Sequence, residues 1–547
     1  MQEHKQQQHT TITIAPTPEI ANYARRTNDH DDDDDDAQTV HEGEPKRLPL
    51  RRADSEVTAT VKEPPLTTTD RPWYTKDLLS IGKKEQILDP RDYPMVKKSM
   101  ILLVVAVAGT ISPVATTIYY PAIVDMQVAL NTTDTSMNAS LSVFTFVTAF
   151  FPLPWSMLGD RYGRRPIYLA SFFISVIGSI CCAVSVNIGM FIAFRAISAI
   201  GSSSVMSMGA GTISDIFEPH QRGRAFAYYT SGPLLGPAIA PIIGGYLNEG
   251  LGWRSNFWFL AIFAFCIWVG ILLVLPETWR PSDKALFQQK EQDIQEKQQQ
   301  GPSTPPEKNA TSKTIKTKTN FGALLGPLQL FRFPNIMLAI SFVGILFLVY
   351  YLINTNFTRI YTNQYGLDSG TVGLCYLPMA AGAIIGGLAG GKFSDTTYKK
   401  RVKKVKSTEE IRAEMRLGGP VFYGSLVLQL FAFIAFGWCI EKNVHYGVGL
   451  VCLFFVGLAL MIPNVTVSAY LVDCFSKQGA AVTACNNFVR YIMAGIGSLI
   501  ASDIQRALGT GILYTICGAA MLLISANMVA IRIYGKKWAQ KRKEAGL

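Results

Sequence analysis

Two arginines stand inside long apolar stretches of the chain, where a charged side chain is costly. Arg195 lies within Phe194 to Gly201, and Arg490 follows Asn486 and Asn487 by about one helical turn. On membrane-insertion scales an arginine at the centre of a span costs about 2.5 to 3.5 kcal/mol, so such residues tend to bind a partner or serve transport. Fixed positive charge favours anions. The two residues therefore indicate recognition or movement of a solute.

Residue patterns that would indicate an enzyme are missing from the sequence. We find no nucleotide-binding loop, no metal-ligand cluster and no nucleophile beside a base. No Asp, Glu or His stands in the middle of an apolar stretch. The nearest carboxylates stand at the ends of such stretches: Asp125, Asp160, Asp215, Asp395 and Asp473. We predict no enzyme activity, cofactor or metal, and the residue that would carry a proton stays unnamed.

Apolar stretches recur over most of the chain. Its 547 residues are 49% hydrophobic and 17% charged, and long apolar stretches alternate with short polar breaks from Met100 to Tyr534. A helix of about 18 or more apolar residues crosses the ~30 Å hydrocarbon core of a bilayer. We predict an all-α membrane protein with twelve transmembrane helices, at 99–122, 139–158, 167–187, 188–215, 225–248, 255–276, 335–356, 370–391, 418–440, 446–470, 480–503 and 510–533.

Polar segments divide these spans into two halves of six. We predict a disordered cytoplasmic tail (1–98), an N-terminal half (99–276), a cytoplasmic linker (277–334), a C-terminal half (335–535) and a short cytoplasmic tail (536–547). The run Asp31 to Asp36 in the first tail could serve metal binding or docking, but a solvated disordered segment explains it better.

Basic residues collect in loops on one side of the predicted bundle. Arg161, Arg164 and Arg165 follow the second span, and Lys399 to Arg401 follow the eighth, whereas the other side offers little beyond Arg254, Arg359, Lys442 and Arg506. Cytoplasmic loops are enriched in Lys and Arg, so both termini should face the cytoplasm. The net charge of +11 then reflects membrane orientation, and we expect no nucleic-acid partner. On the opposite face, Asn131 and Asn138 open candidate glycosylation sequons.

One loop motif occurs twice. Residues Ser156 to Pro166 follow the second span, and Gly391 to Lys400 follow the eighth with the glycine, the aspartate and the paired cations kept. Equivalent positions in the two halves indicate internal repetition. A carboxylate at a helix end can pair with cations or helix termini of the other half and hold one conformation until a substrate shifts the balance.

The first copy resembles the signature loop of the major facilitator superfamily, with Ser156 in place of the first glycine. The resemblance implies that superfamily's fold and an inward-side latch, formed by Asp160, Arg161, Gly163 and Arg164 together with Asp395. In the fifth span, Gly232, Pro233, Gly236 and Pro237 resemble the antiporter motif of drug:proton exporters, although Ala240 replaces the last glycine.

Further segments resemble one fungal branch of this superfamily. Ser112 to Ala122 and Leu275 to Arg280 are similar to the twelve-span drug:proton antiporters. Tyr470 to Phe475 and Ala484 to Arg490 resemble their quinidine-resistance subgroup, which also includes exporters of weak acids, amino acids and polyamines. The resemblance covers residues 90 to 535.

The resemblance also implies a central cavity surrounded by spans 1, 4, 7 and 10. Arg195 is then the leading candidate for proton coupling, with a structural arginine bonded to carbonyls as the alternative. Arg490 either faces the cavity with Asn486 and Asn487 or anchors its helix to the second span and Asp160. Other candidate lining residues are Tyr119, Tyr120, Tyr350, Tyr351, Asn354 and Asn464. Each tyrosine could equally belong to the aromatic belt at the membrane surface.

These features predict a monomeric, proton-coupled exporter of drugs or other toxic compounds that works by alternating access. We predict that it lies in the plasma membrane, with a vacuolar membrane as the alternative. The alternative is an exporter of a metabolite such as a citrate-like organic acid, an amino acid or a polyamine. The fifth-span motif argues against a nutrient importer. The low-complexity linker provides no soluble domain for a sensor.

Overall fold

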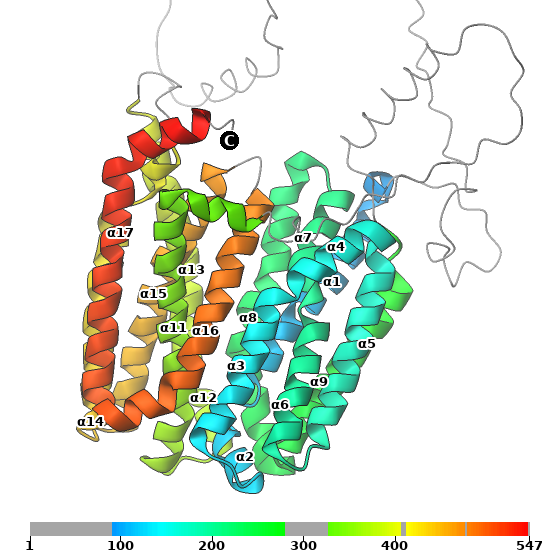
Figure 1. Cartoon of the computed structure of the whole chain (residues 1–547), viewed down its shortest axis with the longest axis vertical. Coiled ribbons are helices and arrows are strands. Elements are labelled where there is room, and N and C mark those ends of the chain that lie inside the picture. Colours follow the sequence, from blue (N-terminus) through cyan, green and yellow to red (C-terminus); the bar gives the residue numbers. More distant parts are fainter. Residues whose placement is uncertain (1–89, 279–326, 406–411, 476–478, 545–547) are drawn as a thin grey trace, which may run out of the picture. The chain divides into compact units, whose positions relative to one another are not determined.

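The computed structural model describes residues 90–278, 327–405, 412–475 and 479–544 (Figure 1). All of them belong to one of two units into which the chain divides, Pro65–Leu547. The acidic run, nearly all of the predicted first tail and most of the predicted linker lie outside the described residues.

The helices up to residue 278, which we call the N-terminal helices, account for the first six predicted spans. They are the 3-10 turn η4 (Pro90–Asp92), α1 (Met95–Thr117), α2 (Ile123–Ala129), α3 (Asp134–Phe150), α4 (Pro152–Tyr162), α5 (Arg164–Ala183), α6 (Ile188–Ser202), α7 (Ser204–Ile216), α8 (Pro219–Leu251) and α9 (Arg254–Val274).

The helices from residue 327 onward, which we call the C-terminal helices, account for the other six. They are η6 (Pro327–Arg332), α11 (Pro334–Asn363), α12 (Ser369–Cys375), α13 (Leu377–Val402), η8 (Ala413–Arg416), α14 (Pro420–Glu441), α15 (Tyr446–Cys474), α16 (Gly479–Leu508) and α17 (Thr510–Glu544).

Within the described residues, ten helical segments are long and apolar enough to cross a membrane. The predicted spans 225–248 and 480–503 do not meet that criterion, yet both form helices of 30 residues or more, α8 and α16. At 1.5 Å per residue each reaches about 45 Å, enough for a bilayer. Each is packed between other helices, α8 against α1 and α12 and α16 against α3 and α11, so it needs less apolar surface than a lipid-facing helix.

Three predicted spans are interrupted, and several helices extend beyond the predicted spans. The second span consists of α3 and α4, the fourth of α6 and α7, and the eighth of α12 and α13. Pro152 starts α4 and explains the first interruption, because proline fits the first turn of a helix but not its interior. The last helix extends past residue 533, the predicted end of the twelfth span, since α17 continues to Glu544 through good helix formers.

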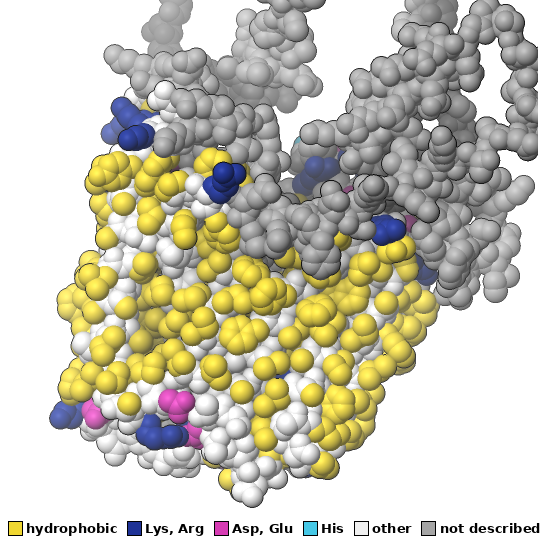
Figure 2. All heavy atoms as spheres, viewed as in Figure 1, with side chains coloured by type: hydrophobic (Ala, Val, Ile, Leu, Met, Phe, Trp, Pro, Cys, Tyr) yellow, Lys and Arg dark blue, Asp and Glu magenta, His cyan; other side chains and the backbone are white. Residues whose placement is uncertain are grey.

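The surface of the helix bundle has an apolar band between two ends that carry charged side chains. Between the ends the visible face is largely apolar, and charged side chains gather at the ends (Figure 2). Side chains such as Leu103, Ile262, Leu388 and Leu523 are all more than 60% exposed. An apolar surface of this extent suits lipid contact. We call the end that carries Arg164, Lys399 and the end of α17 the basic end, and the other the opposite end.

Candidate functional site

The predicted antiporter motif lies where α8 packs closely on α1. A Cβ on Gly232 would come within 2.6 Å of the Ala106 carbonyl oxygen, and one on Gly236 within 3.3 Å of Pro113. About two turns further along α8, a Cβ on Gly244 would collide with the carbonyl oxygen of Ile118. Small residues therefore set the distance between the two helices, and Pro233, Pro237 and Pro241 leave carbonyls without helical partners.

We expect Gly244→Ala to destabilise the protein, because the added methyl group meets backbone that cannot move aside. Overpacking of this kind costs about 1 to 3 kcal/mol. Gly250→Ala is the matched control, since Gly250 lies in the same helix with nothing within 4 Å of its Cβ position. Thermal unfolding of the purified variants should show a lower melting temperature for Gly244→Ala alone. Equal melting temperatures would contradict the close α1–α8 contact.

Arg195 is completely buried in α6 and contacts α1 and α3. Its Nη1 donates a hydrogen bond of 3.0 Å to the carbonyl of Ala115, in the last turn of α1, where helix carbonyls lack partners and a cation is favourable. The guanidinium carbon lies 4.1 Å from the ring centroid of Phe144 and 4.5 Å from that of Tyr119. Its Nε and Nη2 have no hydrogen-bond partner among the described residues. The hydrogen bond to the Ala115 carbonyl is what a structural arginine would form. The Nε and Nη2 donors, which have no described partner, are compatible with a role in proton coupling.

Arg490 faces α11 from α16. Its guanidinium carbon lies 4.9 Å from the ring centroid of Phe347, and its Nη2 donates to the hydroxyl of Tyr491 at 3.2 Å. Nε is buried without a partner among the described residues. The anchoring alternative required Asp160, which instead pairs with Arg164. Arg490 is therefore available for the other alternative, contact with a solute.

Most of the predicted lining residues are buried between helices. Tyr119 and Tyr120 are 0% and 1% exposed, so neither belongs to an aromatic belt at the membrane surface. The Tyr119 hydroxyl lies 3.3 Å from Ser140 Oγ, and Tyr120 stacks on Tyr376 of the C-terminal helices with ring centroids 6.0 Å apart. Tyr120 thus joins the two groups of helices.

The predicted asparagines and the second tyrosine pair lie on the C-terminal helices. Tyr350 and Tyr351 are neighbours with ring centroids 5.7 Å apart, and Asn354 donates to the Tyr350 carbonyl at 2.7 Å. Asn464 and Asn486 each have a buried Oδ1 without a hydrogen-bond partner among the described residues, while Asn487 is half-buried. Buried polar atoms that lack a partner are costly unless water or a ligand satisfies them.

At the basic end, Arg164 binds two carboxylates; we call this set the Asp160 cluster. Arg164 lies 3.3 Å from Asp160, at the end of α4, and its Nε donates to Asp215, near the end of α7. Gly163, at φ +97°, turns the chain between α4 and α5 in a conformation that favours glycine. Glu277 accepts hydrogen bonds from the backbone N–H groups of Arg164 and the next residue, at the start of α5. Arg161 stacks on the Tyr162 ring at 5.2 Å.

The C-terminal helices repeat this arrangement in the Asp395 cluster. Arg416, in η8, pairs with Asp395 near the polar end of α13 and donates to Asp473 at the end of α15, at 2.7 Å. In both clusters an arginine bridges an aspartate from the second span and one from the fourth span of its group. The cation that pairs with Asp395 does not come from the loop motif itself, since Arg416 lies 21 residues beyond Asp395.

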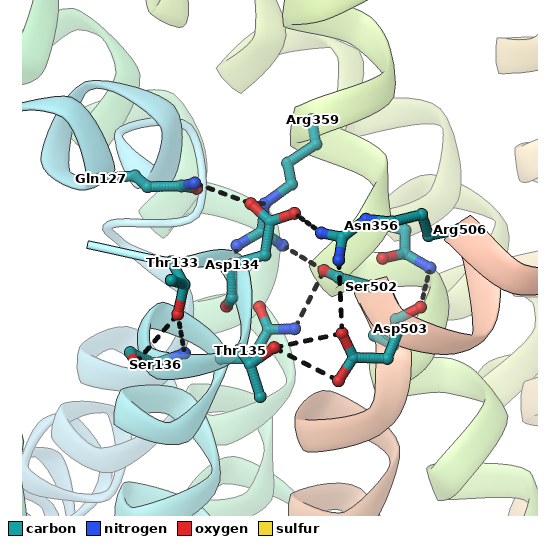
Figure 3. Close-up of polar contacts among 12 residues, drawn as sticks. Gln127, Thr133, Asp134, Thr135, Ser136, Asn356, Arg359, Ser502, Asp503 and Arg506 are labelled. Carbon is teal, nitrogen blue, oxygen red and sulfur yellow. Dashed lines mark hydrogen bonds and ion pairs between the residues drawn. The ribbon is translucent and has the colours of Figure 1, made fainter. Parts of the chain in front are cut away.

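At the opposite end, ion pairs join the two groups of helices in what we call the Asp134 cluster (Figure 3). Asp134, at the start of α3, pairs with Arg359 of α11 at 3.4 Å and with Arg506 of α16. Thr135 donates to Asp503 at 3.1 Å, and Arg359 donates to Ser502 at 2.9 Å. The Arg359 side chain is 9% exposed and that of Asp134 24%, so the pair is largely shielded from water.

A second polar contact joins the groups nearby. Asn248 of α8 donates to Asp125 of α2 and, at 2.9 Å, to the hydroxyl of Ser369 in α12. Within the described ranges, the hydrogen bonds and ion pairs that join N-terminal to C-terminal helices lie at the opposite end. The described ion pairs of the two clusters at the basic end each join residues of one group.

Asn138 requires a correction. It is completely buried, and its Nδ2 donates to Ser502 across the two groups at 3.0 Å. In this conformation it cannot accept a glycan. Asn131 is exposed, with φ +45°, and stays a candidate glycosylation site.

The sequence reasoning missed Asp134 and Arg416 and gave no role to Arg359 and Arg506. Asp134 was placed in a loop because the second span was predicted to start at residue 139, five residues too late. Arg359 and Arg506 could have been noticed because they stand on the side of the membrane where cations are scarce. Membrane orientation does not explain an arginine on that side, so a specific partner is expected. Arg416 had no local signal, because only the folded loop brings it to Asp395.

Comparison with protein families decides what this bundle is. A family model described as "Major Facilitator Superfamily" matches residues 105–498, more than half of the chain. The chain belongs to the major facilitator superfamily. The family predicted from the loop motifs is thereby confirmed, and so is the class of protein, a multi-pass membrane transporter rather than an enzyme.

Curated relatives point to one branch of the superfamily. The chain is 28% identical to "MFS antiporter QDR3" of Candida albicans, over 82% of this chain and 79% of that protein. It is 32% identical to "MFS transporter fsa7" of a Fusarium species, over 82% of this chain and 86% of that protein. It is 24% identical to "Quinidine resistance protein 3" of Saccharomyces cerevisiae, over 83% of this chain and 84% of that protein. The predicted similarity to the quinidine-resistance subgroup is confirmed.

Solved structures of other superfamily members share the fold. A bacterial homologue of the human lysosomal transporter Spinster matches with a TM-score of 0.57 and 16% identity, over 82% of this chain and 98% of that one. A D-xylose–proton symporter also matches with a TM-score of 0.57 and 16% identity, over 79% and 97%. At such identities the likeness shows the fold alone, and the predicted major facilitator fold is confirmed.

Proposed function

We propose that the chain is a proton-coupled exporter of drugs or other toxic small molecules, which works by alternating access and exchanges its substrate for protons. The observation that carries the proposal is the distribution of contacts between the two groups of helices. Polar contacts that can break and re-form join the groups at the opposite end, whereas the described ion pairs of the two clusters at the basic end each join residues of one group. Such an arrangement suits a protein that closes one end at a time.

We further propose that the basic end faces the cytoplasm, at the plasma membrane, with 99–276 and 335–535 as the two moving halves. The excess of Lys and Arg at that end supports this orientation. The conformation described here is then closed toward the outside. Asp160, with an exposed fraction of 59% and Arg164 as its described partner, is free to meet the C-terminal helices when the inner end closes.

The relatives named as an antiporter and as a quinidine-resistance protein support export of drugs. The second candidate is export of an organic acid, and Arg490 favours it. Arg490 is half-buried, its Nε lacks a partner, and it pairs with no carboxylate among the described residues. A positive charge that no fixed carboxylate neutralises is suited to an anionic substrate.

Direction and substrate class can be tested in cells that express the chain. Such cells should retain less radiolabelled quinidine than cells with an empty vector, because the exporter removes it. The organic-acid alternative predicts unchanged quinidine retention and increased release of citrate. Greater accumulation of either compound would mean import and would overturn the proposal.

Arg195→Ala is expected to abolish proton coupling. We expect transport driven by a pH gradient to fall at least about tenfold, the effect of losing a buried charged contact of about 1.4 kcal/mol. Exchange of labelled for unlabelled substrate without a pH gradient should continue. If gradient-driven transport survives in Arg195→Ala, the residue is structural. Arg195→Lys, which keeps the charge, should recover part of the coupling.

A further inference from the structure

Two arginines and a tyrosine hydroxyl converge beside a glycine turn at the basic end of the C-terminal helices. A Cβ built on Gly418 would lie 3.1 Å from the Tyr423 hydroxyl, 3.2 Å from Arg401 Nη2 and 3.3 Å from Arg532 Nη1. Arg401 comes from the end of α13, Tyr423 from the first turn of α14 and Arg532 from α17. Three polar atoms from three helices thus surround one point.

The two guanidinium groups are fixed in this position. Arg401 Nη1 donates hydrogen bonds of 2.7 Å to the carbonyls of Met415 and Leu417, which leaves Nη2 directed toward the shared point. Arg532 Nη1 donates to the Tyr423 hydroxyl at 3.1 Å, so the proton of that hydroxyl is available to another acceptor.

Neither arginine pairs with a carboxylate among the described residues, unlike Arg164 and Arg416, each of which binds two. Two like charges at this separation repel each other, and an anion between them turns the repulsion into charge-assisted hydrogen bonds. We propose that this group, Arg401, Tyr423 and Arg532, binds the phosphate of an anionic phospholipid.

Two glycines form the turn beside these donors. Gly418 and Gly419 have φ values of +102° and +110°, in the left-handed region that favours glycine. A Cβ at 418 would crowd the three donor atoms, so the donors lie close against the turn and close to one another. Gly419 is also the N-cap of the 22-residue helix α14, whose N-terminal dipole adds to the attraction for an anion.

The surroundings favour a lipid over a soluble anion. Ile533 and Tyr534 directly follow Arg532 and are 66% and 55% exposed. Beyond them, Lys536 and Lys537 are exposed at the polar end of α17. Lys and Arg side chains gather at this end, above the apolar band (Figure 2). An apolar face next to a basic cluster matches the acyl chains and the headgroup of an anionic lipid.

The test uses the purified full-length protein in detergent and does not depend on the proposed transport function. Native mass spectrometry would measure retention of phosphatidylserine, with phosphatidylcholine and inorganic phosphate as the other two probes. The test variant is Arg532→Gln, which removes an exposed side chain whose described bond is the one to Tyr423. Lys536→Gln is the matched control, with the same charge change one turn further along α17.

We expect wild type and Lys536→Gln to retain one phosphatidylserine in preference to phosphatidylcholine, and Arg532→Gln to bind it about tenfold more weakly, as the loss of a charge-assisted hydrogen bond implies. Tyr423→Phe should weaken binding as well. Equal binding by Arg532→Gln and Lys536→Gln would overturn the site. Displacement of the lipid by millimolar inorganic phosphate would overturn the assignment to a lipid in favour of a soluble anion.

Discussion

Arg359→Gln is expected to open the end of the transporter that the Asp134 cluster closes. Arg359 pairs with Asp134 across the two groups of helices and donates to Ser502 within its own group, and its side chain is 9% exposed. Removing a largely buried, charge-assisted contact costs about 2 kcal/mol, which corresponds to a roughly 30-fold change in the ratio of closed to open molecules. Asp134→Asn should have a similar effect, because Asp134 also binds Arg506.

Spin labels can report this opening. Val128 in α2 is 78% exposed and Ile512 in α17 is 51% exposed, and both helices contribute to the opposite end (Figure 1). In nanodiscs, pulsed electron resonance between labels at these positions should show a longer-distance population in Arg359→Gln than in the unmodified protein. Lys442→Gln, a change of an exposed cation at the same end, is the control. Identical distance distributions in Arg359→Gln, Asp134→Asn and the control would show that the cluster does not hold this end closed.

The second large effect is expected for Asp160→Asn, which should reduce transport at least tenfold while the protein remains in the membrane. Arg164 keeps Asp215 as a partner, so the fold should tolerate the change. What is lost is the carboxylate that we propose to engage the C-terminal helices when the inner end closes, a charged contact of about 1.5 to 3 kcal/mol.

Transport into vesicles and the amount of protein in the membrane should be measured together for Asp160→Asn. Asp92→Asn, a change of an exposed carboxylate near the same end, is the control. Near-normal transport by Asp160→Asn would remove the latch assignment. A loss of protein from the membrane would instead make Asp160 a structural residue. Asp215→Asn should cause such a loss, because it leaves the buried Arg164 with its weaker partner alone.

The fold could be predicted from the sequence because each membrane-spanning helix is determined mainly by the apolar residues of its own segment. Each lipid-facing helix needs about 20 apolar residues, and the doubled loop motif marks equivalent points in the two groups. The predicted spans differ most from the observed helices where a helix does not coincide with an apolar stretch of sequence. The helices α8 and α16 are less apolar than the other spans and pack against other helices, and α17 continues for about three turns past the predicted end of its span at residue 533.

The candidate site was less predictable because its contacts connect distant segments. Arg195 was visible as a charge in an apolar stretch, but its contact with the Ala115 carbonyl depends on where α1 ends. In the Asp134 cluster, Arg359 lies 225 positions and Arg506 lies 372 positions after Asp134 in the sequence. The sequence around Asp134 therefore gives no indication of either partner. Arg416 was missed for the same reason, because it lies 21 residues beyond Asp395.

We propose that this superfamily member exchanges substrate for protons. Proton movement in proteoliposomes of the purified protein, on addition of quinidine and, separately, of citrate, tests this exchange most directly. We expect a proton signal with quinidine that is absent from protein-free liposomes and strongly reduced in Asp160→Asn. A signal with citrate alone would make Arg490 part of an anion site and the protein an organic-acid exporter. Passage of quinidine without any proton movement would contradict proton-coupled export.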